Sequence, residues 1–175
     1  MKIKHISFLL IAYFLMAFGL PKNIQKKVDK EIKSVYNVEN FTFNAFTISP
    51  KITEALPSKF EDNNLFKIES NNQSLGYAYI SKALSKTDEF DYLVLLDTNL
   101  TVLKTKVLVY REDYGGEIGS KRWLKQFTGK KQGDNLRYND NIVAISGATI
   151  SVRSMTNAMN NLLKSLRILH SKNIL

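Results

Sequence analysis

The chain has 175 residues, of which 44% are hydrophobic and 23% charged, and its formal net charge is +9 at pH 7. This composition fits one globular domain with a buried core and excludes wholesale disorder. The absence of cysteine excludes disulfides, iron–sulfur clusters and thiolate catalysis. The two histidines, His5 and His170, lie near opposite ends, so the sequence predicts no metal site. Redox chemistry in this chain would need an organic cofactor.

The N-terminus combines a charged start with a short apolar run. Lys2 and Lys4 precede the run, which extends from Ile6 to Leu20 and ends at Pro21. This pattern is typical of an export signal or a single membrane anchor. We predict that residues 1–21 form an apolar helix of this kind, either cleaved or retained. The rest of the chain is then expected on the extracytoplasmic (periplasmic) side of the cell membrane.

Residues 22–64 are predicted to form an amphipathic helix and a connecting segment. Apolar residues recur in steps of four, four and three from Ile24 to Val35, which indicates a helix over 22–36. The opposite face carries Lys22, Lys26, Lys27, Lys30 and Lys33. These lysines either meet lipid head groups or form a solvated face. Residues 37–64 are polar and interrupted by prolines, which indicates loops and short pieces.

Strand patterns dominate the next part of the chain. They cover residues 65–69, 75–81, 90–97 and 101–110. The last two form an expected hairpin that turns at Asp97-Thr98-Asn99. Residues 90–96 are apolar on both faces, which indicates an internal strand.

The remaining elements are short, except the last. A Gly-rich stretch, 114–120, precedes a short helix that Ser120 is predicted to cap and Gly129 to end. A polar loop over 130–138, a short strand over 142–145 and a helix over 151–170 follow. The order of elements predicts an α+β fold, with a mostly antiparallel sheet flanked by helices and preceded by one N-terminal apolar helix.

The segment Ile145-Ser-Gly-Ala-Thr-Ile-Ser151 lies between the predicted strand and the last helix. Small residues at 146–148 let a ligand approach the backbone closely. Free N–H groups at a helix start favour an anion such as phosphate, and Thr149 places a hydroxyl there. The alternative is an ordinary turn in which the Ser151 side chain caps the helix.

The segment Ser146-Gly147-Ala148-Thr149, followed by Ile150-Ser151, resembles the flavinylation motif of the FMN-binding domain family. That family includes peripheral flavin subunits of sodium-pumping NADH:quinone oxidoreductases and of related ferredoxin-linked complexes. The resemblance implies that the Thr149 hydroxyl forms a phosphoester with FMN. Ser146, Gly147, Ala148 and Ser151 would then belong to the cofactor-binding turn.

The resemblance extends over about residues 65–165. The segments 92–97, 115–119 and 123–129 are similar to the family's strand, Gly-rich turn and aromatic segment ending in Gln-Phe-x-Gly. It implies that residues 65–175 form an FMN-binding domain in which Glu117 and Trp123 line the flavin ring. Without the resemblance, Glu117 reads as a turn residue and Trp123 as core.

One position departs from the family motif. The family commonly has Asp three residues before the Ser or Thr of the motif, where this chain has Val143. The departure motivates an alternative in which the domain binds FMN without a covalent bond or has only a structural role. A further alternative, a basic module for lipid or nucleic acid, rests on the charge of +9. No nucleic-acid motif accompanies that charge, and export argues against it.

The function that follows is that of an electron carrier rather than a stand-alone catalyst, with no catalytic residue of its own. The implied partners are an FAD-dependent flavin transferase, membrane redox subunits and the membrane surface, but no nucleic acid. The resemblance implies that the cofactor is FMN. The isoalloxazine ring of FMN would supply the electron transfer.

Overall fold

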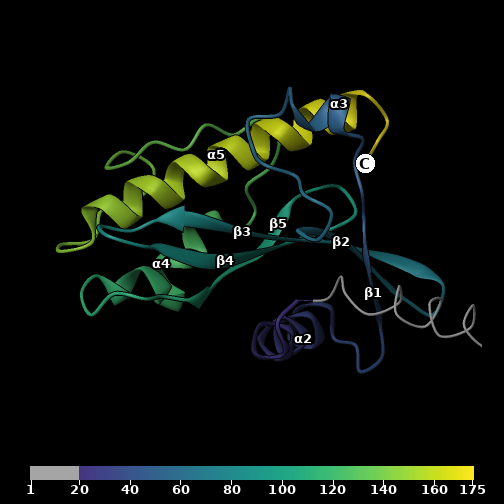
Figure 1. The fold of residues 1–175 in the computed structure, drawn as a ribbon, viewed down its shortest axis with the longest axis horizontal. Coiled ribbons are helices and arrows are strands. Elements are labelled where there is room, and N and C mark those ends of the chain that lie inside the picture. The colour runs from purple at the N-terminus through teal and green to yellow at the C-terminus, as the bar shows by residue number, and fades with distance from the viewer. Residues whose placement is uncertain (1–19) are drawn as a thin grey trace, which may run out of the picture.

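The computed structural model describes residues 20–175. A five-stranded antiparallel sheet of order β1-β2-β3-β4-β5 forms its middle layer. The long helix α5 crosses one face of the sheet and α2 lies against the other (Figure 1). The expected α+β fold with a mostly antiparallel sheet and flanking helices is confirmed.

The strands are β1 (Thr42–Ala45), β2 (Leu65–Ser70), β3 (Gln73–Leu84), β4 (Glu89–Leu96) and β5 (Val102–Val109). The α-helices are α2 (Lys22–Tyr36), α3 (Pro50–Thr53), α4 (Lys121–Leu124) and α5 (Thr149–Ser171), and the 3₁₀ turns are η1 (Gly116–Gly119) and η2 (Lys125–Phe127). The predicted helix over 22–36 and all four predicted strands are confirmed, with ends shifted by a few residues.

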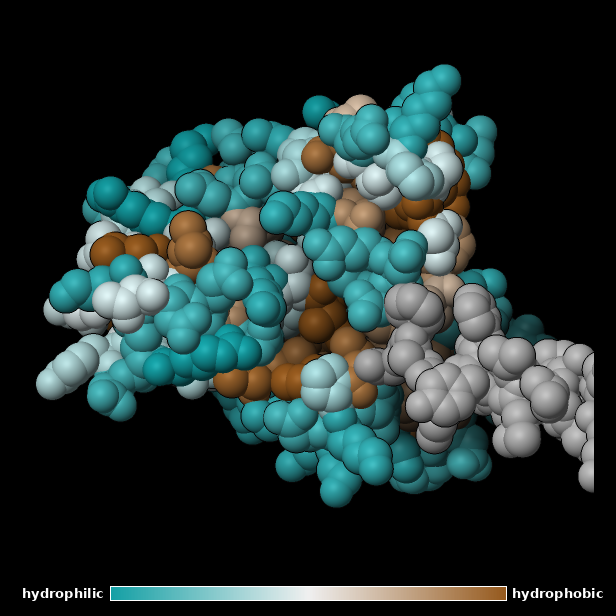
Figure 2. All heavy atoms as spheres, in the orientation of Figure 1, coloured by the Kyte–Doolittle hydropathy of each residue, from teal (hydrophilic) through white to brown (hydrophobic). Residues whose placement is uncertain are grey.

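Each face of the sheet has its own core, because side chains alternate between the two faces along a strand. On β4, Tyr92 and Val94 join the core under α5, whereas Leu93 and Leu95 join the core over α2. The prediction that this strand is internal and apolar on both faces is therefore confirmed. Hydrophilic side chains cover the region of α2 in Figure 2, and hydrophobic residues emerge in the hollow above it.

The hairpin between β4 and β5 turns where the sequence predicts. The Asp97 carboxylate accepts hydrogen bonds from the N–H groups of Asn99, at 2.9 Å, and Thr101, at 2.8 Å. Such side-chain-to-backbone bonds are the reason that Asp favours turns. Asp97 thus fixes the connection between the two strands.

Three local predictions differ from the structure. The strand predicted over 142–145 is wrong, since only Ile142 forms an isolated bridge, with Tyr138. The backbone of the next residue instead bonds to side chains of α4 and η2. The sequence also missed β1 and α3, which have four residues each. Four residues are too few for the hydrophobic periodicity of a helix or a strand to be recognised in the sequence.

The predicted signal or anchor over 1–21 lies almost entirely outside the described residues, and so does its apolar helix. Within residues 20–175, no helix is long and apolar enough to cross a membrane. The division into segments 1–21, 22–64 and 65–175 stays a prediction. The five lysines of α2 are exposed as expected, and Lys27 donates to the backbone oxygen of Leu108 at 2.5 Å.

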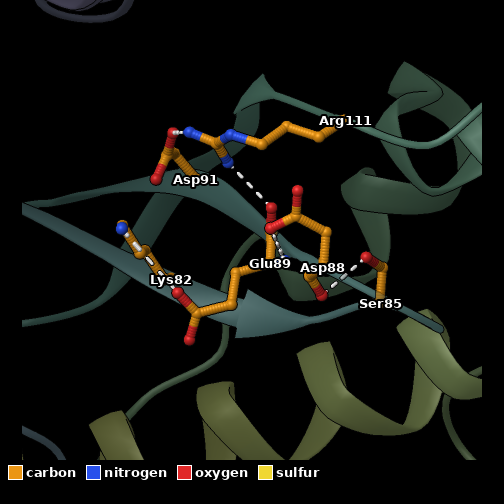
Figure 3. A network of polar contacts seen from close by, with 6 residues as sticks. All are labelled: Lys82, Ser85, Asp88, Glu89, Asp91 and Arg111. Carbon is orange, nitrogen blue, oxygen red and sulfur yellow. Dashed lines mark hydrogen bonds and ion pairs between the residues drawn. The ribbon is translucent and has the colours of Figure 1, made fainter.

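Hydrogen bonds and an ion pair connect the loop after β5 to the hairpin formed by β3 and β4 (Figure 3). Arg111 donates to the backbone oxygen of Glu89 at 2.7 Å and pairs with Asp91 at 2.5 Å. The neighbouring Glu112 accepts from the backbone N–H of Thr87 at 2.6 Å. These contacts hold the start of the segment that carries the Gly-rich turn.

Candidate functional site

The Ser-Gly-Ala-Thr segment forms a tight turn that leads directly into α5. Gly147 has a φ of +80°, in the left-handed region that glycine adopts without strain. The Ala148 N–H bonds back to the Ile145 oxygen at 3.2 Å, which closes the turn. The helix then begins at Thr149, whose side chain is exposed.

No side chain caps the N-terminus of α5. The N-cap position is Ala148, which has no acceptor to offer, and the first turn contains no acidic residue. Helix geometry leaves the N–H groups of Thr149, Ile150 and Ser151 without an intrahelical acceptor. Together with the positive end of the helix dipole, they form a site suited to an anion.

Ser151 has a different role from that of a cap. It lies within the first turn of α5, is 3% exposed, and its hydroxyl is 3.2 Å from the Tyr110 hydroxyl. Tyr110 in turn donates to the backbone oxygen of Tyr114 at 2.9 Å. The interpretation of an ordinary turn capped by Ser151 is therefore wrong. Its hydroxyl instead joins α5 to the Gly-rich segment.

The Gly-rich segment packs directly on the motif turn. Gly115 has a φ of +79°, and a Cβ atom there would lie 2.9 Å from the Tyr110 hydroxyl and 3.4 Å from the Ala148 Cβ. Only glycine fits this approach. The contact brings the turn at 114–119 next to the motif and leaves Tyr114 85% exposed.

A cavity of about 720 Å³ opens beside the motif. Such a volume is within the range of pockets that hold cofactors. Its wall is formed by Glu117, Ser120, Arg122, Trp123, Gln126, Val143, Ala144, Ile145 and Ser146. Three of the predicted site residues, Glu117, Trp123 and Ser146, thus face one cavity.

Trp123 and Gln126 hold the backbone that precedes the motif. The Trp123 Nε1–H donates to the Val143 oxygen at 2.7 Å, and the Val143 N–H donates to the Gln126 side-chain oxygen at 2.8 Å. Trp123 is 5% exposed and packs edge-to-face on Phe127, so it belongs to the core and to the cavity wall. The Val143 side chain is 64% exposed at the cavity rim.

The charged groups around the motif are mixed in sign. Glu117 and Arg122 both line the cavity. The Arg153 guanidinium stacks 4.7 Å from the centre of the Tyr138 ring. Within residues 20–175, no cluster of three or more His, Cys, Asp or Glu side chains could hold a metal ion.

The predicted site residues therefore occupy three positions. Ser146, Glu117 and Trp123 line the cavity, Gly147, Ala148 and Thr149 form the adjoining turn and helix start, and Ser151 lies beneath them. Sequence reasoning did not single out Tyr110, Arg122 or Gln126. Of these three residues, only Gln126 could have been identified from the sequence, because it belongs to the Gln-Phe-x-Gly segment.

Comparison with known proteins agrees with this geometry. The family model described as FMN-binding domain matches residues 86–164, which run from the β3–β4 turn into α5. The crystal structure of NqrC from Shewanella oneidensis has the same fold, with a TM-score of 0.57 and 14% sequence identity. The alignment covers 83% of this chain and 94% of that one. No curated protein matches. Residues 86–164 of this chain are therefore similar to FMN-binding domains.

Proposed function

We propose that Thr149 carries FMN through a phosphoester bond, and that the chain is an extracytoplasmic, membrane-associated electron-transfer protein. The observation that carries the proposal is the exposed Thr149 at the uncapped N-terminus of α5, beside the 720 Å³ cavity. The match of residues 86–164 to the FMN-binding domain supports the choice of ligand.

Attachment would require a separate flavin transferase that uses FAD. The Thr149 oxygen forms the new bond to the FMN phosphorus while the phosphoanhydride bond of FAD breaks. AMP leaves, and the hydroxyl proton passes to a base of the transferase. Thr149 is therefore an attachment point rather than a nucleophile that turns over.

The residues of the turn fit a phosphoester. The N–H groups of Thr149, Ile150 and Ser151 would stabilise its negative charge. Nothing lies within 4 Å of the place where a side chain on Gly147 would begin, so the approach to the backbone is open. The isoalloxazine ring supplies the electron chemistry when FMN is bound. Ser146, Glu117 and Trp123 line the adjoining space and would orient it.

The proposed partners are redox subunits of the membrane. The fold is that of a protein named NqrC, and the apolar N-terminal segment would hold the domain near the membrane. Tethering raises the effective concentration of a carrier near its partner. A carrier held in this way needs no diffusive search between reduction and oxidation.

A second candidate function is non-covalent FMN binding by the same turn. Val143 brings no carboxylate to the cavity rim where the family motif commonly has Asp. Asp140, the next acid upstream, is paired with Arg137. If the transferase needs that carboxylate, the helix N-terminus would hold the phosphate of FMN without a covalent bond.

The test is the intact mass of the chain after co-expression with the transferase. We expect a gain of one FMN minus one water, located on Thr149 by peptide mapping. The Thr149→Ala variant should show no gain. A matched control is Ser154→Ala, which removes a hydroxyl five residues further along α5 and should keep the gain.

Each other outcome has a distinct meaning. An unmodified chain that is yellow, and loses its colour on denaturation, would support the second candidate. In that case Val143→Asp should restore covalent attachment. A colourless, unmodified chain, produced with a transferase that is active on another substrate, would overturn both candidates.

A further inference from the structure

A second cavity lies on the other side of the short helical segment α4–η2. It has a volume of about 240 Å³ and is enclosed by α2, β5, α4 and η2. None of its lining residues lines the cavity beside Thr149. Residues 122, 123 and 126 face the first cavity, whereas 121, 124, 125 and 128 face the second.

Four lysines from three elements line this second cavity. Lys104 and Lys106 come from β5, Lys121 from α4 and Lys125 from η2. The only acidic residue in its wall is Glu31 of α2. We call the site the lysine cavity.

Glu31 offsets only part of this positive charge. Its carboxylate lies 2.5 Å from the Lys104 ammonium and 3.9 Å from the Lys106 ammonium. In residues 20–175, neither Lys121 nor Lys125 forms an ion pair. The side chains of Lys104 and Lys106 are 33% and 31% exposed, so part of their hydration is already lost. An anion placed here would meet several ammonium groups and one carboxylate.

Thr105 gives an independent sign of a missing partner. It lines the lysine cavity and is 4% exposed. Its side chain lies on the face of β5 opposite to that of Lys104 and Lys106, because it pairs with Val94 of the core under α5. Its Oγ1 is the one fully buried side-chain N or O atom in the described chain without a hydrogen-bond partner. A buried hydroxyl without a partner is destabilising, so such groups are rare. Rotation about the Cα–Cβ bond is the small movement that would let this hydroxyl donate to a ligand.

We propose that the lysine cavity binds a phosphate-type anion. Lysine ammonium groups suit phosphate because they act as mobile point charges with three donors each. Thr105 would add a hydroxyl donor from the side of β5 that shares a core with α4–η2, and Thr128 contributes a second hydroxyl to the same lining. The phosphate could be free or could belong to the head group of an anionic lipid. The site is separate from Thr149 and does not depend on the proposed flavin chemistry.

The test measures binding to the full chain in a non-ionic detergent. The first probe is inorganic phosphate, titrated by calorimetry against chloride at matched ionic strength. The second probe is mixed micelles that contain phosphatidylglycerol or, as a zwitterionic control, phosphatidylcholine. The variants are Lys121→Gln/Lys125→Gln, which removes the two unpaired lysines, and Thr105→Val. The charge-matched control is Lys51→Gln/Lys164→Gln, which replaces two exposed lysines on α3 and α5 that do not line the cavity.

We expect the double variant to weaken binding about 10-fold or more, and Thr105→Val to weaken it several-fold. The control variant should leave it unchanged. Binding of inorganic phosphate would identify a free anion as ligand, and binding of phosphatidylglycerol alone would identify a lipid head group. The proposal is overturned if neither probe binds, or if the control weakens binding as much as the double variant does. The second result would indicate diffuse attraction by the net charge of +9.

Discussion

The two cavities beside α4–η2 present ligand-binding groups of different kinds. Beside Thr149, the donors for an anion are backbone N–H groups, placed by a glycine turn and the start of α5. In the lysine cavity the donors are side chains of β5, α4 and η2. The first site therefore depends on backbone conformation, and the second on the chemistry of particular side chains.

This difference predicts how each site fails. A site of backbone N–H groups survives most side-chain changes but fails when the turn changes its conformation. A site of lysines keeps its shape when one side chain is replaced, yet loses binding. A substitution that changes the backbone of the turn should therefore affect only the site beside Thr149. A substitution that removes a lysine should affect only the lysine cavity.

The largest expected effect is that of Gly115→Ala. At Gly115 the φ is +79°, and the added Cβ would lie 2.9 Å from the Tyr110 hydroxyl. We expect a loss of about 1–3 kcal/mol in the free energy of unfolding, measured by urea denaturation. Flavin loading should fall as well, because the same contact positions Ala148. Phosphate binding to the lysine cavity should be unchanged.

Gly116→Ala is the matched control for that substitution. Gly116 has no positive φ, and nothing lies within 4 Å of the place where its Cβ would be. It should change neither stability nor flavin loading. Equal effects at the two glycines would mean that the packing between the Gly-rich turn and the motif does not matter.

Thr105→Val is expected to change stability and binding in opposite directions. The variant removes a buried hydroxyl without a partner, so the chain without ligand should gain about 1 kcal/mol. Anion binding should weaken, and flavin loading should stay the same. The measurement is urea denaturation with and without phosphate.

Thr156→Val provides the contrast to that prediction. The Thr156 hydroxyl is buried and donates to the Val152 oxygen at 2.7 Å. Its removal should lower stability, because a bond is lost. If Thr105→Val is also destabilising, the Thr105 hydroxyl already has a partner, such as a bound water.

The difference between the motif turn and the lysine cavity also explains how much of each site the sequence could predict. Residues 146–149 are contiguous, so the motif turn is visible as a string of letters, and the helix after it as a periodic pattern. The lining of the lysine cavity extends from Glu31 to Thr128, and no local pattern links these positions. Only the fold brings α2, β5 and α4–η2 together.

The errors of prediction have the same origin. A short strand was predicted over 142–145 because these residues are apolar and precede a helix. The backbone of Val143 is instead bonded to Trp123 and Gln126, about 20 residues away. Ser151 was considered as a cap because serine favours that position. In the structure the helix begins at Thr149, so Ser151 lies inside its first turn, where its hydroxyl contacts that of Tyr110.

The smallest expected effect concerns Glu112, in the segment that joins the two sites. This residue follows β5, which lines the lysine cavity, and precedes the Gly-rich turn beside Thr149. The nearby Ser85 hydroxyl, together with hydrogen bonds from the backbone N–H groups of Thr87 and Asp88, lowers the pKa of Glu112 from 4.5 to about 2. A lowered pKa in the folded chain means that the ionised carboxylate stabilises the fold.

The sign of the pH dependence follows from that shift. The stabilisation is complete above pH 4.5 and is lost as the pH falls to about 2. Glu112→Gln should therefore flatten the fall in melting temperature across this window. Glu54→Gln, at an exposed residue after α3, should keep the slope of the parent chain. If protonation of Glu112 loosens the Gly-rich turn alone, protection of its amides against hydrogen exchange should fall with pH before that of β5 does. Simultaneous loss in both would mean that the two sites unfold as one cooperative unit.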